Sequence, residues 1–209
     1  MKKLVKSLKK QCELNEDNAV KVVFQDEAHF QVQTSITSMW AEKGSEPKVM
    51  SKPGKQNVAY SGYLIPETGE LIVTKPGWFN FETVIKSFRD FLSVMPLEEG
   101  KKFCMVLDNA PWHQKAIRLI WKEEQTEYQD IRDKMTYISL PPYSPDLNPI
   151  EQVWRITRKE VTHNRYFPNR EVLESTLDEY YAGLREPNEK LASLCSFKCF
   201  HNSAESTKD

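Results

Sequence analysis

Three acidic residues stand in short signatures along the chain, and their side chains could together hold metal ions. Asp26 and Asp108 each come at the end of an apolar run, and Glu151 stands near the start of an expected helix. Carboxylate oxygens are the hard ligands that Mg²⁺ and Mn²⁺ prefer. Two such ions about 3.5–4 Å apart can activate an attacking oxygen and stabilise the leaving oxygen of a phosphodiester. The three acids therefore predict a two-metal site for phosphodiester cleavage or transfer.

The first two acids are expected at the ends of buried strands. Residues 19–24 and 103–107 are compact runs of apolar residues, which is typical of such strands. Adjacent strands lie about 4.7–4.9 Å apart, so side chains from neighbouring strand ends can share one ion. Glu27 competes with Asp26, but successive side chains of a strand point to opposite faces, so only one of the two can face the metals.

The third acid is expected in the first turn of a helix that Asn148 caps and Pro149 begins. Spacings of three and four residues place Arg155 and Arg158 on the helical face of Glu151. The helix that offers a carboxylate to metal would then also offer cations to DNA phosphates. This basic cluster of candidate DNA-binding residues comprises Arg155, Arg158, Lys159 and Arg165.

The other hydrophobic patterns predict an α/β fold. Strands are expected at 57–63, 69–74 and 135–140, and helices at 81–95 and 113–125. Asn80 is a candidate cap for the first of these helices. The order strand, hairpin, helix, strand, helix, strand, helix predicts a mixed five-stranded sheet with helices on both faces.

Composition indicates one globular domain without a general attraction to nucleic acid. The chain of 209 residues is 39% hydrophobic and 28% charged, and 29 basic residues stand against 30 acidic ones. Any DNA contact must therefore come from local patches. Four cysteines do not indicate a disulfide framework in a chain of this length, and no apolar stretch is long enough to cross a bilayer. We expect a reducing, cytoplasmic setting and no membrane partner.

The acidic signatures resemble those of bacterial insertion-sequence transposases of the mariner-like superfamily. The matching segments are 25–30, 107–113 and 140–154, of which the last is the most specific. The resemblance runs from about Ala19 to Phe167, which is most of the chain. It implies an RNase H-like catalytic domain with an Asp-Asp-Glu (DDE) triad that cleaves and transfers DNA strands with Mg²⁺ or Mn²⁺.

Carried onto this sequence, the resemblance selects Asp26 over Glu27. Asp26, Asp108 and Glu151 are then both the catalytic residues and the ligands of two ions. Asp146 competes with Glu151, but it follows Ser-Pro, which is turn chemistry, so we assign it to a turn. The implied partners are the transposon ends and the target DNA, and the implied location is the bacterial cytoplasm, at the nucleoid.

Two neighbours of Asp108 are candidates for support from a second layer around the metals. Asn109 could donate a hydrogen bond to a ligand carboxylate, or could simply tolerate the turn. His113 could orient a metal-bound water or contact DNA, or could be a polar residue of a helix cap.

Two features depart from the family pattern. The 42 residues between Asp108 and Glu151 exceed the usual spacing, and we place the excess in a surface extension around 123–134. Only about eighteen residues precede the first expected strand, whereas such transposases usually carry an N-terminal helix-turn-helix region. We therefore expect a catalytic half of a split or longer protein. A separate helix-turn-helix chain and a second copy of this chain are its candidate partners.

The expected organisation is a basic segment over residues 1–18, a catalytic domain over 19–186 and a polar tail over 187–209. In the tail, Cys195, Cys199 and His201 have half of a metal-binding spacing but no convincing partner pair, so buried thiols are the favoured interpretation.

Two other functions stay open at this level. One is an RNase H-like nuclease that hydrolyses a strand without joining it to another. The other is a catalytically silent DNA-binding remnant of a transposase. Three clustered acids argue against the remnant, because without a metal their charges only repel one another.

Overall fold

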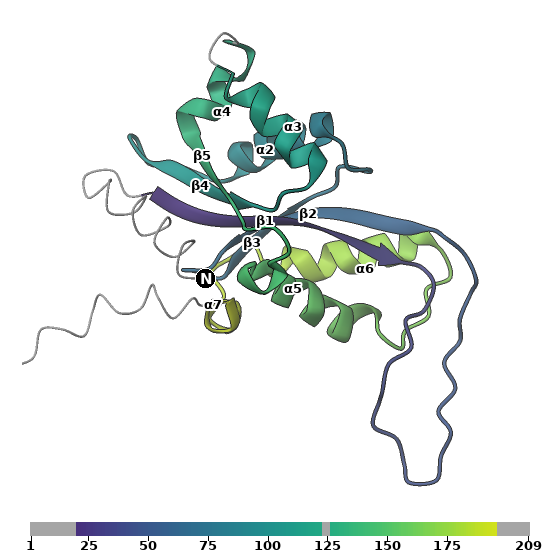
Figure 1. Cartoon of the computed structure of the whole chain (residues 1–209). Coiled ribbons are helices and arrows are strands. Elements are labelled where there is room, and N and C mark those ends of the chain that lie inside the picture. Colours follow the sequence, from purple (N-terminus) through teal and green to yellow (C-terminus); the bar gives the residue numbers. More distant parts are fainter. Residues whose placement is uncertain (1–19, 123–125, 196–209) are drawn as a thin grey trace, which may run out of the picture.

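A mixed five-stranded sheet runs through the centre of the molecule (Figure 1), which is a computed structural model that describes residues 20–122 and 126–195. The strand order is β3-β2-β1-β4-β5; β1, β2 and β3 pair antiparallel, and β1, β4 and β5 pair parallel. The predicted mixed sheet is confirmed. The strands are β1 Val20–Gln31, β2 Asn57–Ile65, β3 Glu70–Thr74, β4 Lys102–Leu107 and β5 Met135–Ser139.

Helices cover both faces of this sheet, as predicted (Figure 1). Each set of helices buries its apolar residues against one face in a separate hydrophobic cluster. The first face carries α2 Phe81–Val94, α3 Pro111–Ile120 and α4 Gln129–Lys134. The second face carries α5 Ile150–Thr157, α6 Arg170–Ala182 and α7 Glu189–Cys195. Short 3-10 helices at Thr126–Tyr128 and Pro145–Leu147 and a π-helical turn at Arg158–Thr162 complete the described elements.

The expected end of the first strand is wrong. β1 does not stop at Asp26 but continues to Gln31, because β2 pairs with it over that whole stretch, as far as Gln31 opposite Asn57. Pairing with β4 ends earlier, at Phe24 opposite Val106. Asp26 therefore lies inside β1, at the point where β1 loses its neighbour on one side.

Two expected helix starts are also wrong. α3 begins at Pro111 rather than His113, since the fixed φ of proline suits a first helical position. Asn148 does not cap α5; Pro149 occupies that position, and no side chain caps the helix. The buried Asn148 side chain instead donates a 3.4 Å hydrogen bond to the backbone carbonyl of Gln25 in β1. This bond ties the start of α5 to the strand that carries Asp26.

The segment expected to be a surface extension forms α4, which packs into the first cluster. Ile131 is fully buried, and Asp130 accepts a 2.9 Å hydrogen bond from Nε of Arg89 in α2. Residues 123–125 lie outside the described part of the chain.

The packed structure also extends past residue 186, where a polar tail was expected to begin. Leu191 and Cys195 of α7 are buried in the second cluster. Gly69, in the β2–β3 turn, has a φ of +72°, and a Cβ there would overlap the backbone of Asn188 and Ala192, so only glycine lets α7 approach this turn. The expected segment 1–18 and the residues Cys199 and His201 lie outside the described residues.

A long loop, residues 32–56, connects β1 to β2 and protrudes from the body of the molecule (Figure 1). Its base is fixed to the connection between α5 and α6, where Asn164 donates a 2.9 Å backbone hydrogen bond to Ser35. Within residues 20–122 and 126–195, no helix has the length and apolar character needed to span a membrane.

Candidate active site

The register between β1 and β4 places Asp26 and Asp108 on one face of the sheet. Phe24 pairs with Val106, and each acid stands two residues beyond its member of that pair. Because side chains alternate along a strand, both acids share the face that α5 covers, while Glu27 is on the opposite face.

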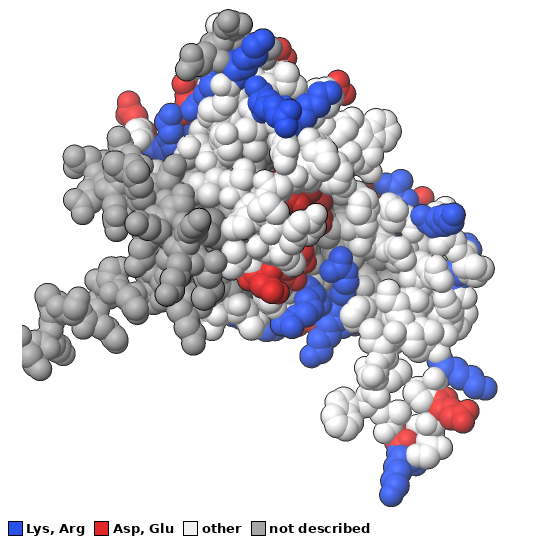
Figure 2. Space-filling view, in the orientation of Figure 1, with Lys and Arg blue, Asp and Glu red and all other residues white. Residues whose placement is uncertain are grey.

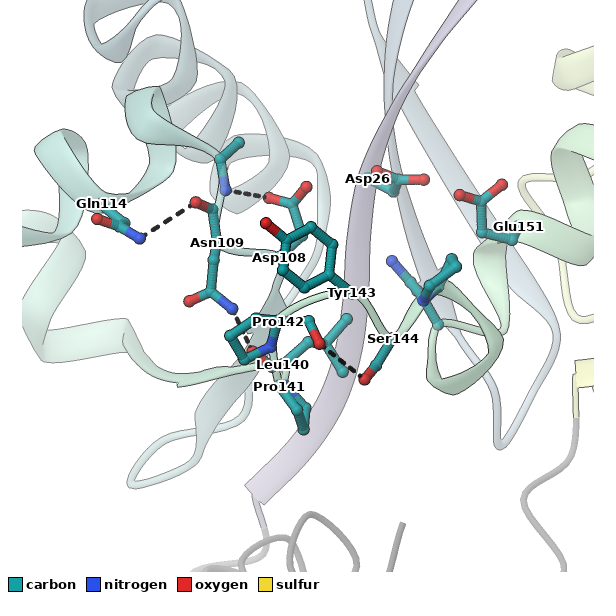
Figure 3. Close-up of a pocket in the computed structure, with 13 residues that line it drawn as sticks. Asp26, Asp108, Asn109, Gln114, Leu140, Pro141, Pro142, Tyr143, Ser144 and Glu151 are labelled. Atoms are coloured by element: carbon teal, nitrogen blue, oxygen red, sulfur yellow. Dashed lines mark hydrogen bonds between the residues drawn. The ribbon is translucent and has the colours of Figure 1, made fainter.

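Glu151, in the first turn of α5, completes a group of three acids around one hollow of about 480 Å³. Figure 3 shows the side chains of Asp26 and Glu151 facing one another, with Asp108 beside β1 at the end of β4. The structure thus brings together the three acids that the sequence singled out, from β1, from the end of β4 and from α5.

A glycine and a tryptophan fix the position of Asp26. Gly62 of β2 is paired with Asp26, and the ring of Trp154 lies so close to Gly62 that a Cβ there would overlap it. From this position Nε1 of Trp154 donates a 3.1 Å hydrogen bond to Oδ2 of Asp26. The close approach of α5 to β2 therefore orients the first acid.

Burial and charge repulsion raise the pKa of Asp26 to about 7. Loss of hydration is the larger cause and the negative charge of Glu151 the second, and together they outweigh the hydrogen bonds to the carboxylate. In the described part of the chain, no Lys or Arg forms an ion pair with either acid. This pair of carboxylates lacks the positive charge that would favour its ionisation.

Divalent cations suit this set of donors, since hard carboxylate oxygens face a hollow with uncompensated negative charge. Among the described residues, however, no three His, Cys, Asp or Glu side chains are already arranged as a metal cluster. Mg²⁺ takes many of its ligands from water and substrate phosphate rather than from a closed protein cage.

Asp108 is held differently from Asp26. Its Oδ1 accepts hydrogen bonds from the backbone N–H of Ala110 at 2.9 Å and from Nδ1 of His113 at 2.5 Å. Burial alone would raise the pKa of Asp108, but these bonds and the nearby imidazole lower it below its ordinary value. Asp108 is therefore ionised across the neutral pH range.

His113 is fully buried and lies between two carboxylates. Its Nε2 is 2.7 Å from Oε1 of Glu27, on the far side of the ring from Asp108. Burial lowers its pKa, but hydrogen bonds and charge attraction from both acids outweigh burial and raise the pKa to about 9. His113 thus neither lines the hollow nor caps the helix. This contact with Glu27 was not predicted from the sequence, because strand alternation indicates only which face Glu27 lies on and not which distant residue it meets.

Asn109 lines the hollow, but its amide does not contact any of the three acids. It donates a hydrogen bond to the carbonyl of Leu140 and so joins the end of β4 to the end of β5. Next along that loop, Tyr143 is fully exposed at the rim of the hollow with a φ of 55°, a rare conformation for a bulky residue.

A second hollow of about 320 Å³ adjoins the first on the face of α5. Glu151, Arg155, Arg158 and His163 all contribute to its lining, which agrees with the expected shared helical face. Figure 2 shows acidic and basic side chains adjacent on this side of the molecule. Of the expected basic cluster, Lys159 and Arg165 are exposed but are not part of this lining.

Comparison with known proteins decides the family. Residues 21–174 match the family described as DDE superfamily endonuclease. The chain belongs to this family. The resemblance predicted from the acidic signatures is confirmed at that level.

An uncharacterised protein, y4pE/y4sA, of Sinorhizobium fredii (strain NBRC 101917 / NGR234) is 34% identical to this DDE-family chain over 71 residues, which are 34% of this chain and 44% of the relative. Among solved structures, the Mos1 strand transfer complex matches with a TM-score of 0.61 at 16% identity, covering 93% of this chain and 54% of that chain. The Mos1 mariner paired end complex with Mn matches with a TM-score of 0.57 at 16% identity, covering 91% of this chain and 56% of that chain.

These likenesses confirm the RNase H-like fold of the DDE-family chain. The chain spans about half the length of the proteins that it matches.

The pKa of Asp26 predicts how the protein without metal responds to pH. In the unfolded chain this pKa is about 3.8 and in the folded protein about 7, so ionisation of Asp26 destabilises the fold progressively between pH 4 and 7 and fully above pH 7. Asp26→Asn lacks this penalty. With a chelator present, the Tm of Asp26→Asn should exceed the wild-type Tm by more at pH 8 than at pH 5. Each kcal/mol of destabilisation removed should raise Tm by roughly 2–4 °C.

The matched control is Asp133→Asn, an exposed acid of α4, whose Tm difference from wild type should not depend on pH in this way. Thermal unfolding followed by circular dichroism measures both variants. An equal advantage of Asp26→Asn at pH 5 and pH 8 would contradict the electrostatic account of this carboxylate.

Proposed function

We propose that the chain is the catalytic domain of an insertion-sequence DNA transposase that cleaves a DNA strand and joins the freed 3′-hydroxyl to target DNA. The observation that carries this proposal is the convergence of Asp26, Asp108 and Glu151 on one hollow in a DDE-family fold. Support also comes from the solved structures that share the fold, which include strand-transfer and paired-end complexes of Mos1, some with Mn or Mg.

The three acids would hold two Mg²⁺ or Mn²⁺ ions. When bound, two such ions supply Lewis-acid activation of the attacking water or 3′-hydroxyl and stabilise the leaving oxygen. Asp108 presents an ionised carboxylate at neutral pH, whereas Asp26 must lose a proton as it takes up its cation, because its pKa without metal is about 7. Binding should accordingly tighten as pH rises through that value.

The basic residues next to Glu151 would hold the DNA backbone. Arg155 and Arg158 line the second hollow, which adjoins the hollow of the three acids. A phosphate bound there would place its strand against these acids. The exposed Lys159 and Arg165 would extend this contact along the strand. The guanidinium of Arg158 also lies 5.4 Å from the ring centre of Phe30, a contact that restrains its side chain.

Transposon ends and target DNA are the proposed substrates, in the bacterial cytoplasm at the nucleoid, where chromosomal DNA is found. A second copy of this chain and a separate helix-turn-helix chain remain the proposed partners. Recognition of a specific end sequence would come from the separate helix-turn-helix chain.

Neutralising any one of the three acids should abolish the reaction. Activity should fall by at least roughly 10²–10³-fold in each of Asp108→Asn, Asp26→Asn and Glu151→Gln. Each substitution removes a ligand of the metal ions that would stabilise the transition state. The assay uses Mg²⁺ or Mn²⁺ and a branched oligonucleotide that mimics the joined product. The branch itself directs reversal of joining, so no end recognition is needed.

Asp133→Asn serves again as the control and should retain wild-type activity. Equal activity in Asp108→Asn and wild type would refute the site. Hydrolysis of DNA or of an RNA–DNA hybrid without any joining would support the nuclease alternative, and no metal-dependent chemistry on any of these substrates would favour the silent remnant.

Loss of one phosphate contact should weaken DNA binding in a way that depends on salt. Arg155→Ala should lower affinity for DNA of any sequence, and the slope of log K against log salt should become shallower by about 1. Fluorescence anisotropy with labelled DNA, without divalent metal, measures the slope. Lys86→Ala removes an exposed cation of α2 on the opposite face of the sheet and should leave the slope unchanged; an unchanged slope for Arg155→Ala would remove Arg155 from the DNA interface.

A further inference from the structure

We propose that Glu27 is a positioning residue for the metal site and acts on Asp108 through His113. This role rests on the proposed function, because it concerns how one of the proposed metal ligands is held. Glu27 does not line the hollow, and its side chain is only 7% exposed, on the face of β1 opposite to Asp26. Its contribution to the site must therefore pass through another residue.

Three hydrogen-bond donors converge on the Glu27 carboxylate. Nε2 of His113 and Nε2 of Gln25 donate to Oε1 at 2.7 and 2.9 Å, and Nε1 of Trp112 donates to Oε2 at 3.4 Å. A buried carboxylate costs free energy unless it is hydrogen-bonded or paired in this way. Glu27 is thus a fixed group, and its shortest contact is the one to His113.

His113 transmits this fixed position to Asp108. With Nε2 bound to Glu27 and Nδ1 bound to Asp108, both the place and the plane of the ring are determined. The contact to Asp108 alone would fix only one edge of the ring. Because His113 is fully buried, water cannot replace either partner.

The bonds to Asp108 leave one of its oxygens available. His113 and the N–H of Ala110 both donate to Oδ1, and among residues 20–122 and 126–195 no donor reaches Oδ2. The carboxylate is therefore held from one side and offers its other oxygen to a cation. Outer partners of this kind commonly change metal affinity by about 10–100-fold when they are removed.

Two consecutive residues of β1 would then serve the same site from opposite faces of the sheet. Asp26 points directly into the hollow from the face that α5 covers. Glu27 points toward α3 and reaches the hollow through His113 and Asp108. Strand alternation, which separates the two side chains, is what allows one to be a ligand and the other a support.

A double-mutant cycle on metal binding tests this role. Mn²⁺ affinity of the chain, without DNA, is measured from the electron paramagnetic resonance signal of free Mn²⁺, and Tm is measured in parallel. Glu27→Gln keeps the shape of the side chain and should weaken Mn²⁺ binding by about 10–100-fold. His113→Asn keeps a donor near the position of Nδ1 but has no atom that reaches Glu27.

In the His113→Asn background, Glu27→Gln should have almost no further effect on Mn²⁺ affinity, because its route to Asp108 is already cut. Glu82→Gln is the control: it makes the same change at an exposed acid in the first turn of α2 and should leave Mn²⁺ affinity near wild type.

Three outcomes would overturn the role. Wild-type affinity in Glu27→Gln would show that Asp108 does not depend on Glu27. An equal loss in both backgrounds would show that Glu27 acts through general stability rather than through His113. A wild-type chain that does not bind Mn²⁺ at all would overturn this role together with the proposed function, and so would be distinguished from a failure of the positioning role alone.

Discussion

The parallel register between β1 and β4 is the constraint on which the rest of the site depends. Pairing of Phe24 with Val106 places one acid two residues further along each strand, on the same face. The other residues of the site are positioned relative to these two strands. Asn148 ties the start of α5 to β1, and Gly62 lets the Trp154 ring approach β2 closely enough to reach Asp26. A shift of one residue in this register would send one acid to the opposite face.

Gathering negative charge in one place is costly, and the protein compensates it unevenly. Asp108 is compensated from within, by His113 and a backbone N–H, so its ionised form is favoured. Asp26 faces Glu151 and has no cationic partner in the described structure, and its hydrogen bonds do not offset burial and repulsion, so its pKa is raised to about 7. If these carboxylates bind metal as proposed, one of them is already charged at neutral pH and the other ionises as the cation binds, so binding releases a proton.

Sequence patterns predicted the elements whose formation depends on residues close together in the chain. The β2–β3 hairpin, the strands carrying apolar runs and α2 were predicted from periodicity and turn residues, and Asn80 caps α2 through a hydrogen bond from the Thr83 N–H. The errors arose where contacts with distant segments determine the length or the packing of an element. β1 passes Asp26 because β2 pairs with it, and α4 is a packed helix because α2 binds it. The contact of Glu27 with His113 joins residues 86 positions apart, a distance that no periodic pattern encodes.

The central claim is that the carboxylates of Asp26, Asp108 and Glu151 together bind divalent cations. Crystals of the protein grown or soaked with Mn²⁺ test it directly, since anomalous scattering locates the ions without reference to any assumed mechanism. The account predicts anomalous peaks in the hollow between β1, β4 and α5, within coordination distance of oxygens from all three side chains. Manganese bound elsewhere, with these three carboxylates still apart and without an ion between them, would contradict it.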